Sequence, residues 1–296
     1  MYLRWLVGNW LKSEAAERAR DAFTAAAETG REPSAGDPDE PPPPCHVGVV
    51  FALGIESGGL IDRLSGVTAI RGAGFSAHEG GLEGRRVVVV ESGVGLEKAA
   101  QATAMLIAGH QPGWIISAGF AGSLCDQVTG GDIVIADSVA ATGGERLAID
   151  VGMPPSSRLH VGRLLSVDHI VRDPEEKRQL GGEHGAIAVD METYAVAAAC
   201  RQAKVRFMSV RAVTDGVEDR LPPEVENLVR QKTLTGRLGA LTGSIWRRPS
   251  SVKDMWKLRE DALVASDRLA KFLAGVIAQL VPKPAEMPAS EGPESA

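Results

Sequence analysis

The sequence predicts an α/β fold: a three-layer α/β/α domain with a mixed, largely parallel sheet, plus N- and C-terminal helical extensions. Two observations lead to this prediction. Short apolar runs alternate with helix-like stretches through the middle of the chain, which is the pattern of α/β proteins. The run VVVV within 86–91 has no polar alternation, so it suits a strand that is buried on both faces.

The expected elements follow one another in a regular order. An apolar strand at 47–53 is bounded by Gly54, and the strand at 86–91 leads through SGVG into a helix at 96–109. Helices are also expected to begin at 173–176 and to cover 191–201. Further strands are expected at 114–117, 132–136, 164–168, 186–189 and 207–213. No internal repeat is visible.

Composition divides the chain into segments. We expect an N-terminal helical extension at 1–29, a Pro-rich linker at 30–44, the main α/β domain at 45–225, a C-terminal helical extension at 226–281 and a disordered tail at 282–296. The first helix is expected to pack onto the body or a subunit, with contact to a membrane surface as the alternative. The apolar anchors expected in the C-terminal extension are Trp246, Trp256, Leu258, Leu263, Leu269, Phe272 and Leu273.

Charge and cysteine content exclude several classes of protein. The net charge of −6 argues against a nucleic-acid partner, which calls for a basic face. The three cysteines, Cys45, Cys125 and Cys200, have no CxxC spacing, so reduced thiols in the cytoplasm are expected rather than disulfides or a metal site. The first residues lack a long apolar region and a cleavage site, so a secretory signal is not expected.

Glycine-rich or polar segments follow several of the expected strands. They occupy 54–56, 92–95, 117–122 and 214–218, and a fifth at 190–192 lies between a strand and a helix. In open α/β sheets, ligands bind beyond the carboxyl ends of the strands. We therefore expect these segments to meet at one cleft.

Each of these segments also has a purely structural interpretation. Ser92 and Gly93 form either a plain tight turn or a loop that lets the backbone approach a ligand. Glu192 is either a favourable charge at a helix start or an acceptor for ribose hydroxyls with Met191 packed on the sugar, and Asp190 is a candidate helix cap. Asp215 precedes Gly216, so it is either a turn aspartate or a desolvated general acid.

Taken together, these segments resemble the purine nucleoside phosphorylase and nucleosidase superfamily. The resemblance covers about 47–217 through VGVVFALGIE, ESGVG, IISAGFAGSL with GGDIVIAD, AVDMET and VRAVTDG. Within the superfamily, the chain resembles methylthioadenosine/S-adenosylhomocysteine nucleosidases and hopanoid-associated phosphorylases. LPPEV, EKRQL and the stretch WRRPSSVKDMWKLRED resemble the hopanoid-associated branch in particular.

The resemblance implies a role for particular residues. Asp215 matches the aspartate that protonates N7 of the base, and Glu192 with Met191 matches the ribose-binding pair. Glu56 stands where nucleosidases keep the glutamate that activates water, and Gly119 opens the segment that lines the water or phosphate pocket. The resemblance also implies a nucleoside phosphorylase-like fold, a homodimer, and no need for a metal or an organic cofactor.

Four positions depart from the family pattern. Leu96 stands where a lysine is often found after the glycine loop, and Asp190 stands where many relatives have glutamate. Phe120 replaces a small hydroxyl residue of the pocket loop, and Ile170 stands where nucleosidases stack an aromatic ring on the base. A catalytically silent nucleoside-binding module is therefore an alternative. The intact Glu56 and Asp215 favour an enzyme, because a binding module has less need of both an acid and a base.

The nucleophile is the remaining question. A phosphorylase usually holds phosphate with arginines, and the segments around Glu56, Ser92 and Ser117 supply none. Arg211 within a strand and Arg220 after Asp215 are the arginines left to reach the pocket. The sequence therefore predicts hydrolysis of an adenine nucleoside of the methylthioadenosine or S-adenosylhomocysteine type, with phosphorolysis, including of adenosylhopane, as the close alternative.

Overall fold

The computed structural model describes residues 45–72, 75–222, 225 and 249–280. The expected N-terminal helix at 1–29, the linker at 30–44, the tail at 282–296 and Trp246 lie outside the described residues, as do the side chains of Trp256 and Leu258. The segment boundaries therefore stay predictions.

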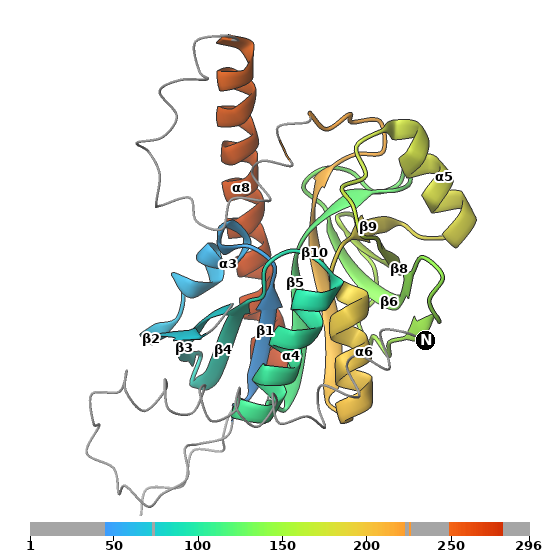
Figure 1. Ribbon diagram of the computed structural model, residues 1–296. Coiled ribbons are helices and arrows are strands. Elements are labelled where there is room, and N and C mark those ends of the chain that lie inside the picture. The colour runs from blue at the N-terminus through green and yellow to red at the C-terminus, as the bar shows by residue number, and fades with distance from the viewer. Residues whose placement is uncertain (1–44, 73–74, 223–224, 226–248, 281–296) are drawn as a thin grey trace, which may run out of the picture.

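A mixed sheet with helices on both faces confirms the predicted fold class (Figure 1). The sheet contains β1 (Val47–Phe51), β2 (Ser65–Gly72), β3 (Phe75–Leu82), β4 (Arg85–Glu91), β5 (Trp114–Ser123), β6 (Ile133–Ala141), β7 (Leu147–Ala148), β8 (Leu159–Ser166), β9 (Ala188–Asp190) and β10 (Arg206–Asp215). The helices are α3 (Gly54–Ile61), α4 (Leu96–His110), α5 (Pro174–His184), α6 (Thr193–Ala203) and α8 (Pro249–Leu280).

The strand order places β1 between β4 and β5, and both pairings are parallel. On one side, β4, β3 and β2 pair antiparallel as a meander. On the other side, β5, β10, β6, β8 and β9 pair in turn, and β9 returns to β5. These five strands therefore form a closed circuit, so the ends of β5, β9 and β10 lie close together.

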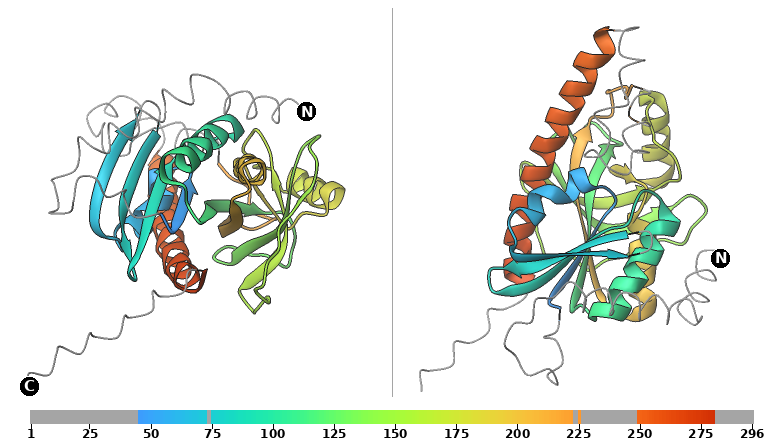
Figure 2. Two further views of the ribbon diagram at one scale, coloured as in Figure 1. Left: turned by 90° about the horizontal axis from the view of Figure 1, so that it is seen from below. Right: turned by 60° about the vertical axis from the view of Figure 1, so that its left-hand side comes forward.

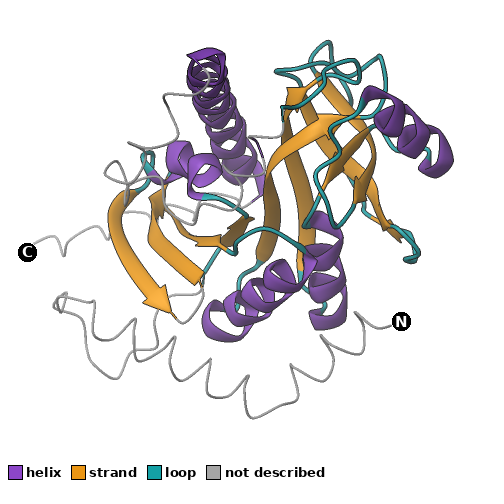
Figure 3. Cartoon of the chain, turned by 45° about the horizontal axis from the view of Figure 1, so that its top comes forward, coloured by secondary structure: helices purple, strands orange, loops and turns teal. Residues whose placement is uncertain are grey.

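The sheet separates two helical layers, which Figures 2 and 3 show from other sides. Helices α4 and α6 pack together on one face, whereas α3 and α8 pack together on the other. The run VVVV confirms the predicted burial on both faces: Val87 and Val89 join the core under α8, and Val88 and Val90 join the core under α4 and α6. Helix α5 lies apart, beside β8 and β9 (Figure 1).

Among the described side chains of α8, those that join the hydrophobic core lie in its C-terminal half. Leu269, Leu273 and Ile277 are fully buried in the cluster that also contains Val49 of β1. Leu263, which was expected to be an apolar anchor, is 53% exposed, so that prediction was wrong. Leu263 lies beside α3, where it lines a surface pocket with Ile55 and Gly59. Within the described part of the chain, no helix is long and apolar enough to cross a membrane.

Replacing Leu269 with alanine tests whether α8 stabilises the domain. Leu269 is fully buried, so we expect Leu269→Ala to lower the free energy of unfolding by about 2–5 kcal/mol in urea titrations. Leu263→Ala on the same helix is the matched control and should change it by no more than about 0.5 kcal/mol. Equal, small effects would contradict the core position of α8.

Candidate active site

The candidate site lies where β1, β5, β9 and β10 end. Strands β1, β5 and β10 run parallel, and Arg211 and Asp215 of β10 lie in register with Gly119 and Gly122 of β5. Strand β9 runs antiparallel to β5 and points its last residue, Asp190, back toward Gly119. The glycine-rich end of β5 therefore runs through the middle of a group of carboxyl side chains.

Glu56 lies in the first turn of α3, directly after β1. Its Oε2 accepts hydrogen bonds from the backbone N–H of Ala52 at 3.1 Å and Leu53 at 2.9 Å, and its Oε1 accepts one from Phe120 N–H at 2.9 Å. The side chain is buried, and burial raises the pKa of Glu56 while the nearby Arg211 charge opposes the rise. The carboxyl group therefore occupies a cradle of backbone donors that bridges β1 and β5.

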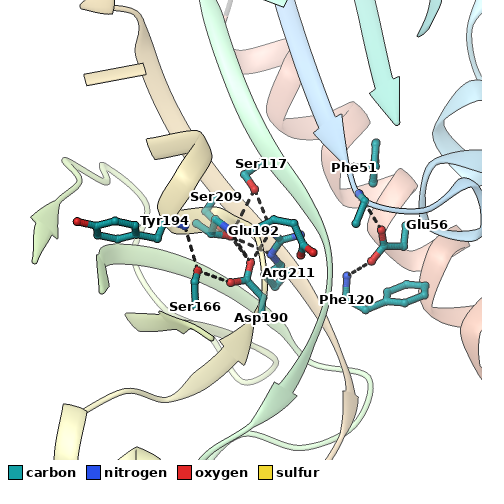
Figure 4. A network of polar contacts seen from close by, with 12 residues as sticks. Phe51, Glu56, Ser117, Phe120, Ser166, Asp190, Glu192, Tyr194, Ser209 and Arg211 are labelled. Atoms are coloured by element: carbon teal, nitrogen blue, oxygen red, sulfur yellow. Dashed lines mark hydrogen bonds and ion pairs between the residues drawn. The ribbon is translucent and has the colours of Figure 1, made fainter. Parts of the chain in front are cut away.

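Arg211 is a buried guanidinium in the middle of the site (Figure 4). Its Nη2 lies 2.6 Å from Asp190 Oδ2 and donates to Ser117 Oγ at 2.8 Å, and its Nε donates to Thr193 Oγ1 at 3.2 Å. A Cβ atom at Gly119 would overlap Arg211 Nη1 and lie 2.8 Å from Glu56 Oε1. Gly119 therefore gives the guanidinium and the Glu56 carboxyl room to lie side by side.

Asp190 and Glu192 lie just before the first residue of α6, Thr193. Asp190 accepts a hydrogen bond from Thr193 N–H at 3.1 Å and another from Ser166 Oγ at 2.5 Å. The N-cap of α6 is Glu192 rather than Asp190, but the Asp190 side chain accepts the first N–H of the helix and is also the counter-ion of Arg211. Glu192 Oε1 accepts from Gly95 N–H at 2.8 Å. Burial, and then the Asp190 charge, raises the pKa of Glu192 to about 8.

Asp215 is a buried carboxyl at the last position of β10. Its Oδ2 lies 2.6 Å from Lys177 Nζ and its Oδ1 accepts from Thr214 Oγ1 at 2.8 Å. Burial raises the pKa of Asp215, and the Lys177 charge opposes the rise. In the turn that follows β10, Asp219 Oδ2 accepts a hydrogen bond from the Gly216 N–H at 2.7 Å. Asp215 is therefore not the turn aspartate that the Asp-Gly pair suggested.

The other predicted site residues occupy the loops around these carboxyl groups. Ser92 Oγ donates to Phe51 O at 3.2 Å and to Gly93 O at 2.8 Å, which ties the glycine loop to the end of β1. Met191 is half-buried between Asp190 and Glu192, and Ile170 is half-buried in the loop between β8 and α5. The roles of Met191 and Ile170 in substrate binding stay predictions.

The sequence does not predict the positions of two cations of the site, Arg211 and Lys177. The sequence leaves open whether Arg211 reaches the pocket, although an arginine inside the apolar strand FMSVRAV is a signal that it needs a buried partner. Lys177 gave no signal, because it stands among the charged residues of DPEEKRQL. Arg220, the other arginine left open, is 71% exposed and pairs with Asp173 at 2.8 Å.

Comparison with known proteins identifies the class. The family model described as the phosphorylase superfamily matches residues 46–158 and 148–236, so the chain belongs to this superfamily. It is 27% identical over 208 residues to the 5′-methylthioadenosine/S-adenosylhomocysteine nucleosidase of Shewanella loihica, covering 61% of this chain and 90% of the relative. The Staphylococcus aureus (strain MRSA252) nucleosidase of the same name is 29% identical over 195 residues, or 57% of this chain and 86% of the relative.

Solved structures show the same fold. The Neisseria meningitidis 5′-methylthioadenosine/S-adenosylhomocysteine nucleosidase, in complex with methylthio-immucillin-A, superposes with a TM-score of 0.60 at 24% identity. The match covers 78% of this chain and 98% of that structure. The similarity therefore extends over nearly the whole of the solved protein.

Gly119→Ala tests the close packing of Arg211 and Glu56. Its methyl group would overlap Arg211 Nη1, so we expect the free energy of unfolding to fall by about 1–3 kcal/mol. Gly58→Ala in α3 is the control, because its methyl group meets nothing within 4 Å and alanine is favoured in helices by roughly 1 kcal/mol. Urea unfolding of both variants checks this; a neutral Gly119→Ala would mean that the guanidinium lies elsewhere.

Proposed function

We propose that this protein hydrolyses the N-glycosidic bond of an adenine nucleoside of the 5′-methylthioadenosine or S-adenosylhomocysteine type and releases adenine. The observation that carries the proposal is the placement of Glu56 and Asp215 at the two ends of one glycine segment of β5. Glu56 bonds to the amide of Phe120, and Asp215 lies in register with Gly122. The sequence similarity to the Shewanella loihica and Staphylococcus aureus nucleosidases supports the same reaction and substrate class.

The spacing of the two carboxyl groups suits a nucleoside. Gly119 and Gly122 are three positions apart, which is ~10 Å along an extended strand. Both lack a side chain, and a Cβ at Gly122 would lie only 3.0 Å from Asp215 Oδ2. The missing side chains thus let Glu56 and Asp215 lie close against the backbone of this segment. We place the base beside Asp215 and the sugar beside Glu56 and Glu192.

Asp215 acts as the general acid. Its burial favours the protonated carboxyl, which donates its proton to N7 of adenine as the bond from N9 to C1′ breaks. The bonding electrons leave with the base, and the proton makes adenine a neutral leaving group. Proton transfer at this point lowers the barrier to bond cleavage.

The sugar becomes an oxocarbenium-like cation as the base departs. Glu56 stands in the buried part of the site, where negative charge stabilises that cation more strongly than in water. Glu192 accepts hydrogen bonds from the ribose hydroxyls. Glu56 then removes a proton from a water molecule that attacks C1′, and the product is the free sugar.

The cradle around Glu56 favours water over phosphate as the nucleophile. Backbone N–H groups and a guanidinium are the donors that bind an oxyanion. Here the N–H groups of Ala52, Leu53 and Phe120 already donate to Glu56, and Arg211 is paired with Asp190. A phosphate would have to displace a resident carboxylate from its donors. This arrangement supports hydrolysis over phosphorolysis.

The contacts of Phe120 weaken one argument for a catalytically silent binding module, namely that Phe120 disrupts the site of the nucleophile. The residue contributes its backbone amide to Glu56, a bond that does not depend on the side chain. Its ring packs against the core under α8. Replacement of the small hydroxyl residue therefore leaves the Glu56 cradle intact, which supports an active enzyme.

We also propose a cytoplasmic homodimer that works without a metal or an organic cofactor. The cytoplasmic location is supported by Cys45, Cys125 and Cys200, which are all free thiols. The dimer rests on the family resemblance. Sedimentation analysis of the full chain tests the dimer, and a monomer at micromolar concentration would contradict it.

Asp215→Asn tests the acid. An amide of the same shape has no proton to give to N7, so we expect adenine release from methylthioadenosine to fall by about 10²–10⁴-fold. Asp219→Asn, in the turn directly after β10, is the matched control and should keep most of the activity. Both variants should keep a cooperative thermal transition. Near-normal turnover by Asp215→Asn would remove Asp215 from its acid role.

Glu56→Gln tests the base. We expect kcat for adenine release to fall by about 10²–10⁴-fold, while binding of a non-hydrolysable analogue changes little. Because burial raises the pKa of Glu56, wild-type activity should fall on acidification at a pH above the usual range of a glutamate. Glu91→Gln is the control, since that carboxylate accepts from Ser57 Oγ and Ser76 Oγ. Equal losses of turnover and binding in Glu56→Gln would contradict the assignment.

A further inference from the structure

Lys177 is a fully buried lysine on α5. Its Nζ donates to Asp215 Oδ2 at 2.6 Å, to Gly216 O at 2.8 Å and to Asp219 O at 2.7 Å. An ammonium group has three protons to donate, and each meets an acceptor. All three acceptors belong to the end of β10 and the turn that follows it.

The contacts of Lys177 differ from the other links between α5 and this segment. Arg178 pairs with Glu218 and Arg220 pairs with Asp173, but these ion pairs are largely exposed to solvent. Exposed pairs contribute little, because water and salt screen them. The buried Lys177 ammonium is therefore the contact that fixes the Asp215 carboxyl relative to α5.

The ammonium also decides which oxygen of Asp215 carries a proton. Oδ2 faces the Nζ donor at 2.6 Å, so a proton on Oδ2 would point at another donor. Oδ1 instead faces Thr214 Oγ1 at 2.8 Å, and that hydroxyl also lies 3.4 Å from the carbonyl of Ala121. The hydroxyl can turn its hydrogen to Ala121 O when Oδ1 is protonated.

We propose that Lys177 is a positioning residue for the general acid: it holds Oδ2 of Asp215 so that the proton transferred to the base is carried on Oδ1. This inference rests on the proposed nucleosidase function. Lys177 touches neither the base nor the sugar in this scheme and acts only through Asp215. A neutral side chain of similar length would fill the same space without orienting the carboxyl.

The proposal predicts a change in pH dependence. Among the described residues, the charged groups that act on Asp215 are Lys177 from α5, which lowers its pKa, and Asp219 from the following turn, which raises it. The protonated Asp215 is the active form, so kcat/KM falls as pH rises through its pKa. Without the Lys177 charge that pKa rises, and the fall in kcat/KM moves to higher pH.

Lys177→Met and Lys177→Arg test the proposal in the full-length enzyme, with adenine release measured from pH 5 to 10. For Lys177→Met we expect kcat to fall by about tenfold or more and the high-pH decline to move up by about one pH unit. Lys177→Arg keeps the charge and should keep the wild-type decline. Arg178→Met, the next residue on the helix, should change neither. An unmoved decline in Lys177→Met would overturn the proposal.

A double variant separates positioning from folding. In the Asp215→Asn background no acid remains to be positioned, so adding Lys177→Met should leave the residual activity unchanged. If Lys177→Met reduces activity by the same factor in both backgrounds, Lys177 is merely structural and the proposal is wrong. This variant also carries no unpaired buried charge, so it remains measurable where Lys177→Met alone unfolds. A wild-type enzyme that releases no adenine would instead refute the proposed function itself.

Discussion

The site depends on one buried guanidinium among several carboxyl groups. Arg211 is fully enclosed and pairs with Asp190, while its charge also acts on Glu56 and Glu192. An unpaired charge in this environment would be very costly, so the surrounding hydroxyl groups and the missing side chain at Gly119 are requirements of the packing. Together with the hydrogen bonds of Arg211, this pairing joins β5, β9, β10 and α6 at the candidate site.

The balance of charge around Arg211 explains how the site stabilises a reacting sugar. Three carboxyl groups, Glu56, Asp190 and Glu192, share this one cation, and burial and mutual repulsion raise the pKa of Glu192 to about 8. A positive charge that develops on the sugar stabilises the ionised form of these carboxyl groups, whereas a neutral substrate does not. The proposed mechanism thus relies on stronger binding of the transition state than of the substrate, which is the condition for catalysis. In the proposed mechanism, Asp215 with its own cation, Lys177, stands at the far end and supplies the proton.

The local pattern of apolar and polar residues predicted those parts of the fold and the site that depend on residues close together in the sequence. The apolar runs located β1, β4 and β10, and the polar residues after them located Glu56 and Asp215. The hairpin of β2 and β3 was missed because its sequence, with residues such as AHEGG, lacks a clear alternation. Lys177 was missed because its burial is decided by Asp215, a residue 38 positions away. The exposure of Leu263 likewise depends on how α8 packs against α3, a segment that is distant in the sequence.

Hydrolysis with water as the nucleophile is the central claim, and isotope labelling tests it most directly. The enzyme is incubated with methylthioadenosine in ¹⁸O-labelled water that contains saturating phosphate. The mass of the sugar product is then measured by mass spectrometry. A cradle already filled by Glu56 predicts a free sugar that carries one ¹⁸O atom, at a rate independent of phosphate. Formation of a sugar 1-phosphate, or adenine release only when phosphate is added, would contradict the account.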